Sequence, residues 1–142
     1  MTKLLLSLAV MLTAAGLGAG DDAEKDLKAL TGTWEEVSHV ADGKKMTADE
    51  LKGTTVVIDA SGKWEAFKDG TSFLKGTGKL DPAKKPKAAD WAIDGSDMVA
   101  KGIYEVDGDT WKHCFSLTER PTAFESKEGS GVHYVVLKRV KK

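Results

Sequence analysis

The sequence predicts an all-β protein, an eight-stranded antiparallel up-and-down barrel preceded by a short helix. From Gly32 onward, short stretches rich in apolar and β-branched residues alternate with turn signals. Ser61-Gly62, Asp69-Gly70 and Asp107-Gly108 stand between consecutive stretches, where glycine supplies the positive φ of tight hairpins. Hairpins between successive strands make a meander, and we expect no long crossover helix. Eight such strands suit a closed barrel, which leaves no exposed edge.

The expected strands lie between these turn signals. Their ranges are Thr33–Val40, Thr54–Asp59, Lys63–Lys68, Ser72–Leu80, Ala88–Asp94, Gly102–Val106, Thr110–Leu117 and Val132–Val140. A short helix is expected over Asp21–Leu30, with an aspartate at its start and Leu27 and Leu30 on one face. Thr47 and Glu50 have the spacing of a capping box, which predicts one helical turn in the loop after the first strand.

The first 20 residues have the three-part pattern of a secretory signal peptide. Lys3 gives a positive start, Leu4 to Leu12 is an apolar stretch, and Thr13 to Gly20 is rich in small residues. The apolar stretch is about half of the ~20 residues that cross a bilayer, so we expect no stable membrane anchor. The predicted organisation is a signal peptide over residues 1–20 and one barrel domain over residues 21–142. Such a chain is secreted or periplasmic.

Composition narrows the function further. The net charge of −1 argues against binding to nucleic acid, which calls for a clear basic excess. Cys114 is the single cysteine of the sequence, so no disulfide can form within the chain. The core alone must therefore stabilise this exported domain, and a chain of this length is sufficient for such a core.

Alternation along the strands assigns side chains to faces. In the seventh expected strand, Trp111, His113, Phe115 and Leu117 share one face, and Cys114 lies on the other. The residues that we expect to line the barrel interior are Trp34, Trp64, Trp91, Tyr104, Trp111, His113 and Phe115. In a pocket of this kind the aromatic rings would supply apolar contact, while His113 and Tyr104 would orient a ligand.

Two parts of the sequence, near the start of the first expected strand and near the end of the last, form a recognisable signature. Gly32-Thr33-Trp34, after the short helix and at the start of the first strand, resembles the Gly-x-Trp signature of lipocalins. Arg139, near the end of the last strand, stands where lipocalins have an arginine that packs against this tryptophan. The resemblance therefore implies a structural signature made by Gly32, Trp34 and Arg139.

A more specific resemblance extends over nearly the whole mature chain. The segments that carry it are Gly32-Thr33-Trp34, Glu50-Leu51-Lys52-Gly53, Lys79-Leu80-Asp81-Pro82, Lys84-Lys85-Pro86-Lys87, Gly102-Ile103-Tyr104-Glu105, Asp107-Gly108-Asp109-Thr110, Cys114-Phe115, Arg120-Pro121-Thr122, Ser126-Lys127 and Gly129-Ser130-Gly131. In this order they resemble the planctomycete paralogous lipocalin-like domain family, whose function is uncharacterised. The resemblance implies a calycin-type barrel and export, with no catalytic residues to carry over. The sequence departs from the family at His113, Trp91 and Gly78, where a branched aliphatic, a smaller aliphatic and an aromatic residue are typical.

The histidines are the main candidates for chemistry. His113 is expected to point inward, as a ligand-orienting donor, a metal ligand, a pH-sensitive group, or a buried histidine satisfied by a hydroxyl or carbonyl. We expect His133 to pair near Leu117, too far from His113 for one shared ion, and His39 lies on another strand. No metal site and no cofactor are therefore expected.

Other reactive groups do not form a catalytic pattern. His113 and Cys114 are neighbours on a strand and point to opposite faces, which leaves Cys114 as a packed thiol or a partner in a mixed disulfide. Glu36 and Glu65 lie mid-strand, where either can face inward, but glycosidase chemistry needs a fixed pair of inward carboxylates. Asp107-Gly108-Asp109 lacks the further ligands of a calcium loop. We therefore expect no enzyme.

Two functions remain from different classes. The first is an exported lipocalin-like module that holds a small apolar or amphipathic ligand inside the barrel. The second is a protein–protein interaction or inhibitor module with a filled barrel, which would act through the loops Asp42–Gly53 and Thr118–Gly131 at its rim. The volume of the barrel interior discriminates between them.

Overall fold

The computed structural model of the chain describes residues 21–141. The predicted signal peptide, residues 1–20, lies outside the described residues. An N-terminal helix includes residues 21–30. It is followed by β1 (Gly32–Ala41), β2 (Lys44–Lys45), α2 (Ala48–Leu51), β3 (Thr54–Ile58), β4 (Lys63–Lys68), β5 (Thr71–Asp81), β6 (Ala88–Ile93), β7 (Val99–Asp107), β8 (Thr110–Ser116) and β9 (His133–Arg139). None of the helices within residues 21–141 has the length and apolarity that a bilayer crossing requires.

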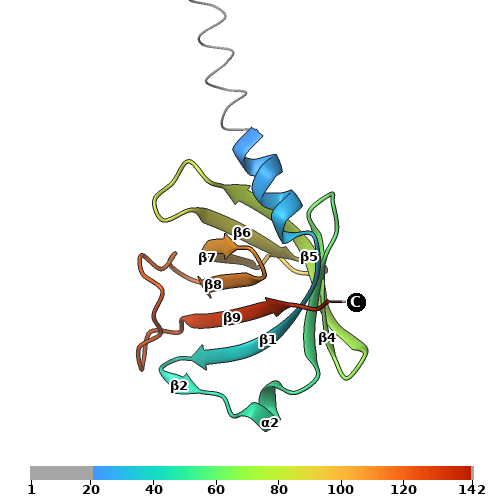
Figure 1. Ribbon diagram of the computed structural model, residues 1–142. Helices are drawn as coiled ribbons and strands as arrows, with labels where there is room; N and C mark the ends of the chain where they lie inside the picture. Colours follow the sequence, from blue (N-terminus) through green and yellow to red (C-terminus); the bar gives the residue numbers. More distant parts are fainter. Residues whose placement is uncertain (1–20, 142) are drawn as a thin grey trace, which may run out of the picture.

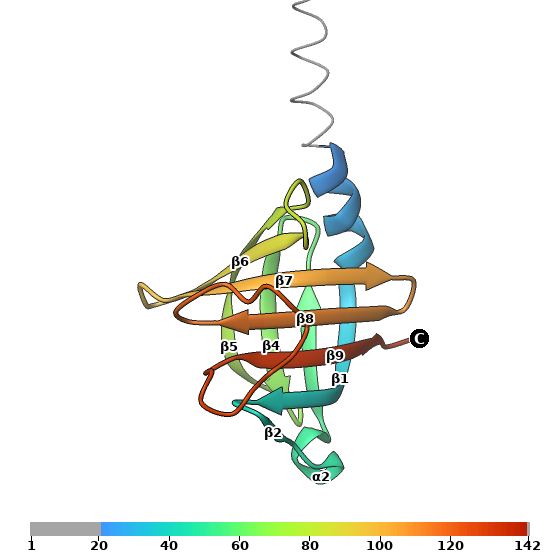
Figure 2. The same cartoon turned by 90° about the vertical axis from the view of Figure 1, so that its left-hand side faces the viewer.

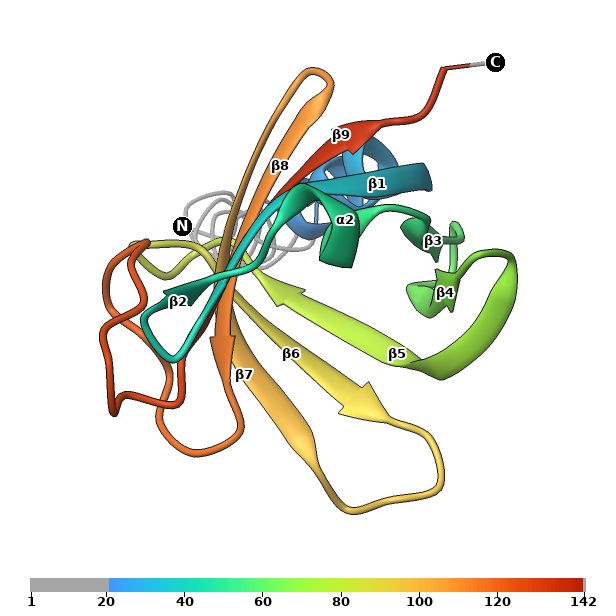
Figure 3. The same ribbon diagram turned by 90° about the horizontal axis from the view of Figure 1, so that it is seen from below.

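The strands form one closed antiparallel barrel (Figures 1 and 3). From β3 to β9 each strand pairs with the next, and β1 pairs with both β3 and β9. Trp34 stands opposite Val56 on one side and Arg139 on the other, which completes the cylinder. The two-residue β2 pairs only with the end of β1. The predicted fold class, an eight-stranded up-and-down barrel with a short N-terminal helix, is confirmed.

The observed strand ends lie within one residue of the predicted ones except at the start of β7. That strand begins at Val99 instead of Gly102, because its ladder with β6 continues through Ala100, which stands opposite Trp91. The predicted helical turn after β1 is also present as α2. Thr47 and Glu50 form both hydrogen bonds of the capping box.

The N-terminal helix lies across one end of the barrel (Figure 1). Leu30 is fully buried and Leu27 packs against the same core cluster. Trp34 is also fully buried, and its Nε1 donates a hydrogen bond of 2.8 Å to the carbonyl of Leu30. The guanidinium of Arg139 lies 4.3 Å from the centre of the Trp34 ring, within the range of a cation–π contact. These contacts join the helix to β1 and β9 and close this end of the barrel.

Gly32 is required by the same arrangement. Its φ of 135° is one that L side chains rarely adopt, and an added Cβ would lie 3.0 Å from Nη1 of Arg139. That nitrogen donates to the carbonyl of Thr31 at 3.0 Å, and Nη2 donates to the carbonyl of Ala29. Arg139 therefore satisfies carbonyls at the end of the helix that have no partner within the helix itself.

A buried carboxylate of the N-terminal helix, Asp26, joins the helix to the barrel. Asp26 is 8% exposed and accepts hydrogen bonds from Oη of Tyr104 at 2.7 Å and from Nζ of Lys87 at 3.0 Å. Burial, with the Asp26 hydrogen bond adding to it, raises the pKa of Tyr104 far above its ordinary value. The phenol therefore stays protonated and acts as a donor that ties the helix to β7.

Two bulges change which side chains face inward. In β1, Val37 is an extra residue between Glu36 and Ser38, which stand opposite consecutive residues of β9. In β5, Phe73 is extra in the same way against β4. Since neighbouring residues of a strand point to opposite faces, one extra residue reverses the alternation beyond it.

The loop between β8 and β9, residues 117–132, folds back over the outer wall of the barrel (Figure 2). Arg120 donates to the carbonyl of Gly102 at 2.8 Å and pairs with Asp90 at 2.7 Å. Cys114 is buried beneath the loop, with Sγ 3.5 Å from the carbonyl of Ala123. Burial raises the pKa of this thiol. Cys114 is thus a packed thiol, one of the two possibilities that the sequence left open. Arg120 and the covered thiol therefore hold this loop against the wall of the barrel.

Candidate functional site

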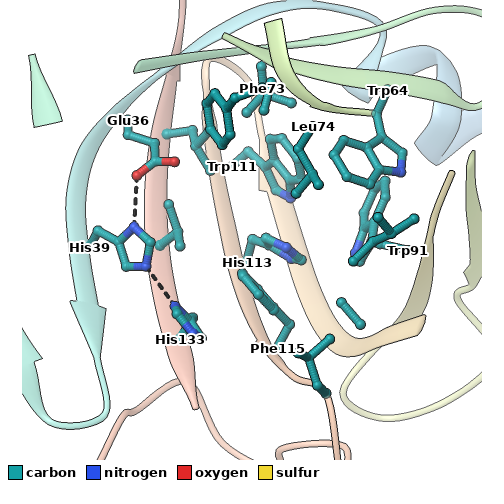
Figure 4. A pocket seen from close by; sticks show the side chains of 17 residues that line it. Glu36, His39, Trp64, Phe73, Leu74, Trp91, Trp111, His113, Phe115 and His133 are labelled. Atoms are coloured by element: carbon teal, nitrogen blue, oxygen red, sulfur yellow. Dashed lines mark hydrogen bonds and ion pairs between the residues drawn. The ribbon is translucent and has the colours of Figure 1, made fainter. Parts of the chain in front are cut away.

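The barrel encloses a cavity of about 340 Å³. The cavity opens at the end opposite the N-terminal helix, where its lining residues Phe73, Leu74 and Leu117 are 58%, 38% and 53% exposed. The rest of the wall is mainly aromatic and aliphatic, and its titratable members are Glu36, His39, His113 and His133 (Figure 4). The barrel is therefore a hollow, apolar container with one polar side.

Five of the residues that alternation assigned to the interior line this cavity: Trp64, Trp91, Trp111, His113 and Phe115. The other two predicted lining residues, Trp34 and Tyr104, belong to the buried core but not to the cavity wall. They fill the closed end beneath the helix, where the Trp34 ring meets Trp111 edge-on at 5.7 Å. Of the seven predicted lining residues, two therefore fill the closed end of the barrel and five line the cavity wall.

The aromatic rings pack in a continuous series along β8. Trp111 and His113 have ring centres 5.3 Å apart, and His113 and Phe115 stack at 4.5 Å. Phe115 stacks in turn on His133 of β9, with 4.9 Å between centres and 6° between planes. Trp91 closes the series from β6, 5.4 Å from His113. Such mutual packing holds the rings of this wall in fixed orientations, with part of their faces covered by one another.

Gly78 and Trp91, two of the departures from the resembled family, are cross-strand partners on β5 and β6. The Trp91 ring lies directly on Gly78, since an added Cβ would come within 2.4 Å of it. A large side chain on β6 therefore takes the space that a side chain on β5 would need. The two departures therefore compensate each other, since the larger side chain at position 91 fills the space left by the smaller residue at position 78. Together they place an indole in the cavity wall.

His113 is enclosed in this wall without a polar partner. Its Nδ1 is fully buried and forms no hydrogen bond within the described residues, as is also true of Nε1 in Trp64, Trp91 and Trp111. The hydroxyl or carbonyl partner expected for a buried histidine is therefore not found for Nδ1. Burial lowers the pKa of His113 to about 3, and the neighbouring histidines His39 and His133 act in the same direction. The ring is neutral at physiological pH and belongs to the apolar wall.

Replacing His113 with leucine is expected to reduce the loss of stability in acid. Between pH 6.5 and about 3, the unfolded chain protonates this histidine and the folded protein does not. Stability therefore falls as the pH is lowered through this window, by about 1.4 kcal/mol per unit for this group. The drop in unfolding free energy between pH 7 and pH 5, measured with urea, should be about 2 kcal/mol smaller in His113→Leu. An equal drop in both proteins would show that His113 titrates normally.

A hydrogen-bonded series of Glu36, His39 and His133, termed here the Glu–His–His triad, forms the polar side of the cavity (Figure 4). Nδ1 of His39 is 2.9 Å from Oε1 of Glu36, and its Nε2 is 3.0 Å from Nδ1 of His133. The side chains of Glu36 and His39 are only 13% and 15% exposed. The predicted register of His133 near Leu117 is wrong, because β9 places His133 opposite Phe115.

Sequence reasoning missed this triad because of the bulge in β1. Glu36 and His39 are three residues apart, so regular alternation puts them on opposite faces of a strand. The extra residue Val37 brings both onto the inner face, and its own side chain is 46% exposed. The sequence offers no signal for this bulge. His39 and His133 meet because β1 closes the barrel against β9.

The remaining candidate groups lie away from the cavity. Glu65 lies between Trp64 and Ala66, which both line the cavity, and is not itself a lining residue. Asp109 pairs with Arg139 and Lys141. Within residues 21–141 no group of three or more His, Cys, Asp or Glu side chains is arranged to hold a metal ion.

Comparisons with known proteins gave no match, either to family models, to curated proteins or to solved structures. The closed eight-stranded barrel is consistent with a lipocalin-like fold. The resemblance to the planctomycete family stays a prediction from the sequence. The cavity and the Glu–His–His triad must therefore carry any statement about function.

Proposed function

We propose that this protein is a binding module that holds one small, flat, apolar or amphipathic molecule inside its barrel. The observation that carries the proposal is the open cavity of about 340 Å³ with a rigid aromatic wall. Ligand pockets in proteins measure roughly 300–1,000 Å³ and combine apolar walls with a few placed polar groups. Aromatic rings pack favourably against a further aromatic ring, offset or edge-to-face, which favours a planar partner.

The hollow interior supports ligand binding over the alternative of an interaction module. That alternative requires a filled barrel and projecting rim loops. The loop of residues 117–132 is instead fastened to the outer wall through Arg120 and lies over Cys114. The hollow interior is the feature that favours ligand binding over this alternative.

The Glu–His–His triad raises the question of catalysis, since converging inward polar groups are what an enzyme would need. The triad supplies a base. Among the described residues, no serine, threonine, cysteine or lysine lines the cavity as a nucleophile that this base could activate. We therefore propose a polar contact for a bound molecule and no turnover.

Export and family membership are part of the same proposal. The pattern of Lys3, the apolar stretch and the small residues up to Gly20 supports a secreted or periplasmic protein. The Gly32, Trp34 and Arg139 contacts at the closed end support a lipocalin-like domain, and the ordered motifs support the planctomycete lipocalin-like family.

Binding can be tested with N-phenyl-1-naphthylamine, a probe whose emission rises in an apolar environment. Ala100 lines the cavity and is 6% exposed, so Ala100→Trp would fill part of the interior. Ala92 is exposed on the neighbouring strand, and Ala92→Trp is the matched control. We expect the wild type and Ala92→Trp to bind the probe alike, and Ala100→Trp to bind at least about tenfold more weakly.

Circular dichroism and thermal melting establish that both variants are folded. Overpacking at Ala100 costs about 1–3 kcal/mol, so Ala100→Leu provides a smaller intrusion should the tryptophan unfold the barrel. Equal affinity of the two tryptophan variants would place the probe outside the cavity. A wild-type protein that binds no member of a panel of planar apolar compounds would overturn the proposal.

A further inference from the structure

In the state with Glu36 ionised and both imidazoles neutral, the hydrogen bonds of the Glu–His–His triad can run in one direction only. An ionised carboxylate only accepts, so Glu36 requires a proton on Nδ1 of His39. A neutral imidazole has one donor and one acceptor, which makes Nε2 of His39 the acceptor. This acceptor takes its hydrogen bond from Nδ1 of His133. The second nitrogen of His133, Nε2, is then an acceptor with a free lone pair.

That nitrogen has no partner among the described residues and belongs to a side chain that lines the cavity. It is also not among the fully enclosed polar atoms, in contrast to Nδ1 of His113. Stacking on Phe115 fixes the orientation of the ring. Burial lowers the pKa of His133, and His39 adds to this, while the carboxylates of Glu36 and Asp42 act in the opposite direction.

The polar side of the cavity therefore presents acceptors. Glu36 and His133 offer lone pairs, whereas the indole donors of Trp64, Trp91 and Trp111 are buried in the wall. A ligand that brings a donor gains a hydrogen bond at this side. A ligand that brings a carboxylate meets another carboxylate and a lone pair, and it must give up its water without compensation.

We propose that the cavity selects planar apolar molecules that carry a hydroxyl group, which donates its hydrogen bond to Nε2 of His133. This inference rests on the proposed function, because it names the class of ligand for the same cavity. It excludes simple carboxylic acids as preferred ligands. The hydroxyl would lie at the edge of the aromatic wall, beside Phe115, with the rest of the molecule directed toward Trp111 and Trp91.

Three naphthalene compounds test this selection: 2-naphthol, its methyl ether 2-methoxynaphthalene, and 2-naphthoate. All three share one ring system. The hydroxyl of 2-naphthol donates a hydrogen bond, the ether oxygen of 2-methoxynaphthalene can only accept one weakly, and 2-naphthoate carries a negative charge. With the wild-type protein, isothermal titration at pH 7.5 should give an affinity for 2-naphthol about tenfold higher than for the ether. The affinity for 2-naphthoate should be the lowest of the three.

The variant His133→Asn removes the acceptor while keeping the triad donor. The amide nitrogen of asparagine lies near the position of Nδ1 and can donate to His39, but nothing replaces Nε2. The preference for 2-naphthol should vanish or reverse in this variant, and the affinity for the ether should stay within about twofold. Trp91→Leu is the matched control, since it removes a ring of the cavity wall that packs on Trp111 and His113 and should weaken both compounds by the same factor.

The outcomes separate this inference from the proposed function. If none of the three compounds binds the wild type, the proposed function fails and takes the inference with it. If naphthol and its ether bind equally, or if His133→Asn keeps the preference, the inference is overturned and the binding function stands. Tighter binding of 2-naphthoate than of 2-naphthol would also overturn the inference.

Discussion

Replacing Trp34 with alanine is expected to lower the free energy of unfolding by about 4 kcal/mol, the range of large aromatic truncations in cores. The Trp34 side chain is fully buried where β1 meets both β3 and β9. Its ring contacts Trp111 and lies under the guanidinium of Arg139, and its Nε1 bonds to Leu30. Alanine would leave a void and an unpaired carbonyl at the point where the helix joins the barrel.

Urea unfolding followed by far-ultraviolet circular dichroism measures this loss. Trp34→Phe is the control, because it keeps an aromatic ring under Arg139 but removes the donor to Leu30. We expect it to cost less than half as much as the alanine variant. A loss of under about 1 kcal/mol in Trp34→Ala would show that the closed end does not depend on this side chain.

Replacing Gly78 with valine is expected to destabilise the protein by about 3 kcal/mol, at the upper end of overpacking effects. The new Cβ would lie within 2.4 Å of the Trp91 ring, which packs against Trp111 and His113 and borders the cavity. The indole must leave its rotamer and enter the cavity. The variant should therefore also bind apolar probes more weakly.

The double variant Gly78→Val with Trp91→Val tests the compensation directly. Trp91→Val alone should cost about 3 kcal/mol by leaving a cavity, but with valine at position 78 that space is refilled. The combined loss should be smaller than the sum of the single losses by about 1–3 kcal/mol, measured by urea unfolding as a double-mutant cycle. Strict additivity would mean that the two positions are independent, which contradicts the observed contact.

The local sequence was sufficient to predict the positions of the strands and, for most of them, which side chains face the barrel interior. Asp-Gly and Ser-Gly pairs mark the hairpins, and alternation in β8 puts Trp111, His113 and Phe115 on one face, where all three line the cavity. Both signals are short-range, since a turn is decided by two residues and a face by the period of two. The closed barrel follows because each strand pairs with its neighbour along the chain.

The triad could not be predicted in this way. The bulge at Val37 depends on how β1 pairs with both β3 and β9. The identity of residue 37 does not predict it. The hydrogen bond from His133 to His39 joins residues 94 positions apart and needs the exact register of the closing pair. The predicted pairing of His133 concerned β8 and β9 and gave no register of β9 against β1.

The sequence by itself determined the number and order of the barrel strands and most of their inward faces, and with them an aromatic interior. Only the tertiary structure decided that this interior stays hollow, that Trp34 and Tyr104 fill its closed end, and that a carboxylate and two histidines meet in its wall. The physical reason is that hairpins and alternation are fixed by near neighbours. Cavity volume and polar convergence depend on barrel closure, where residues far apart in the chain are brought together.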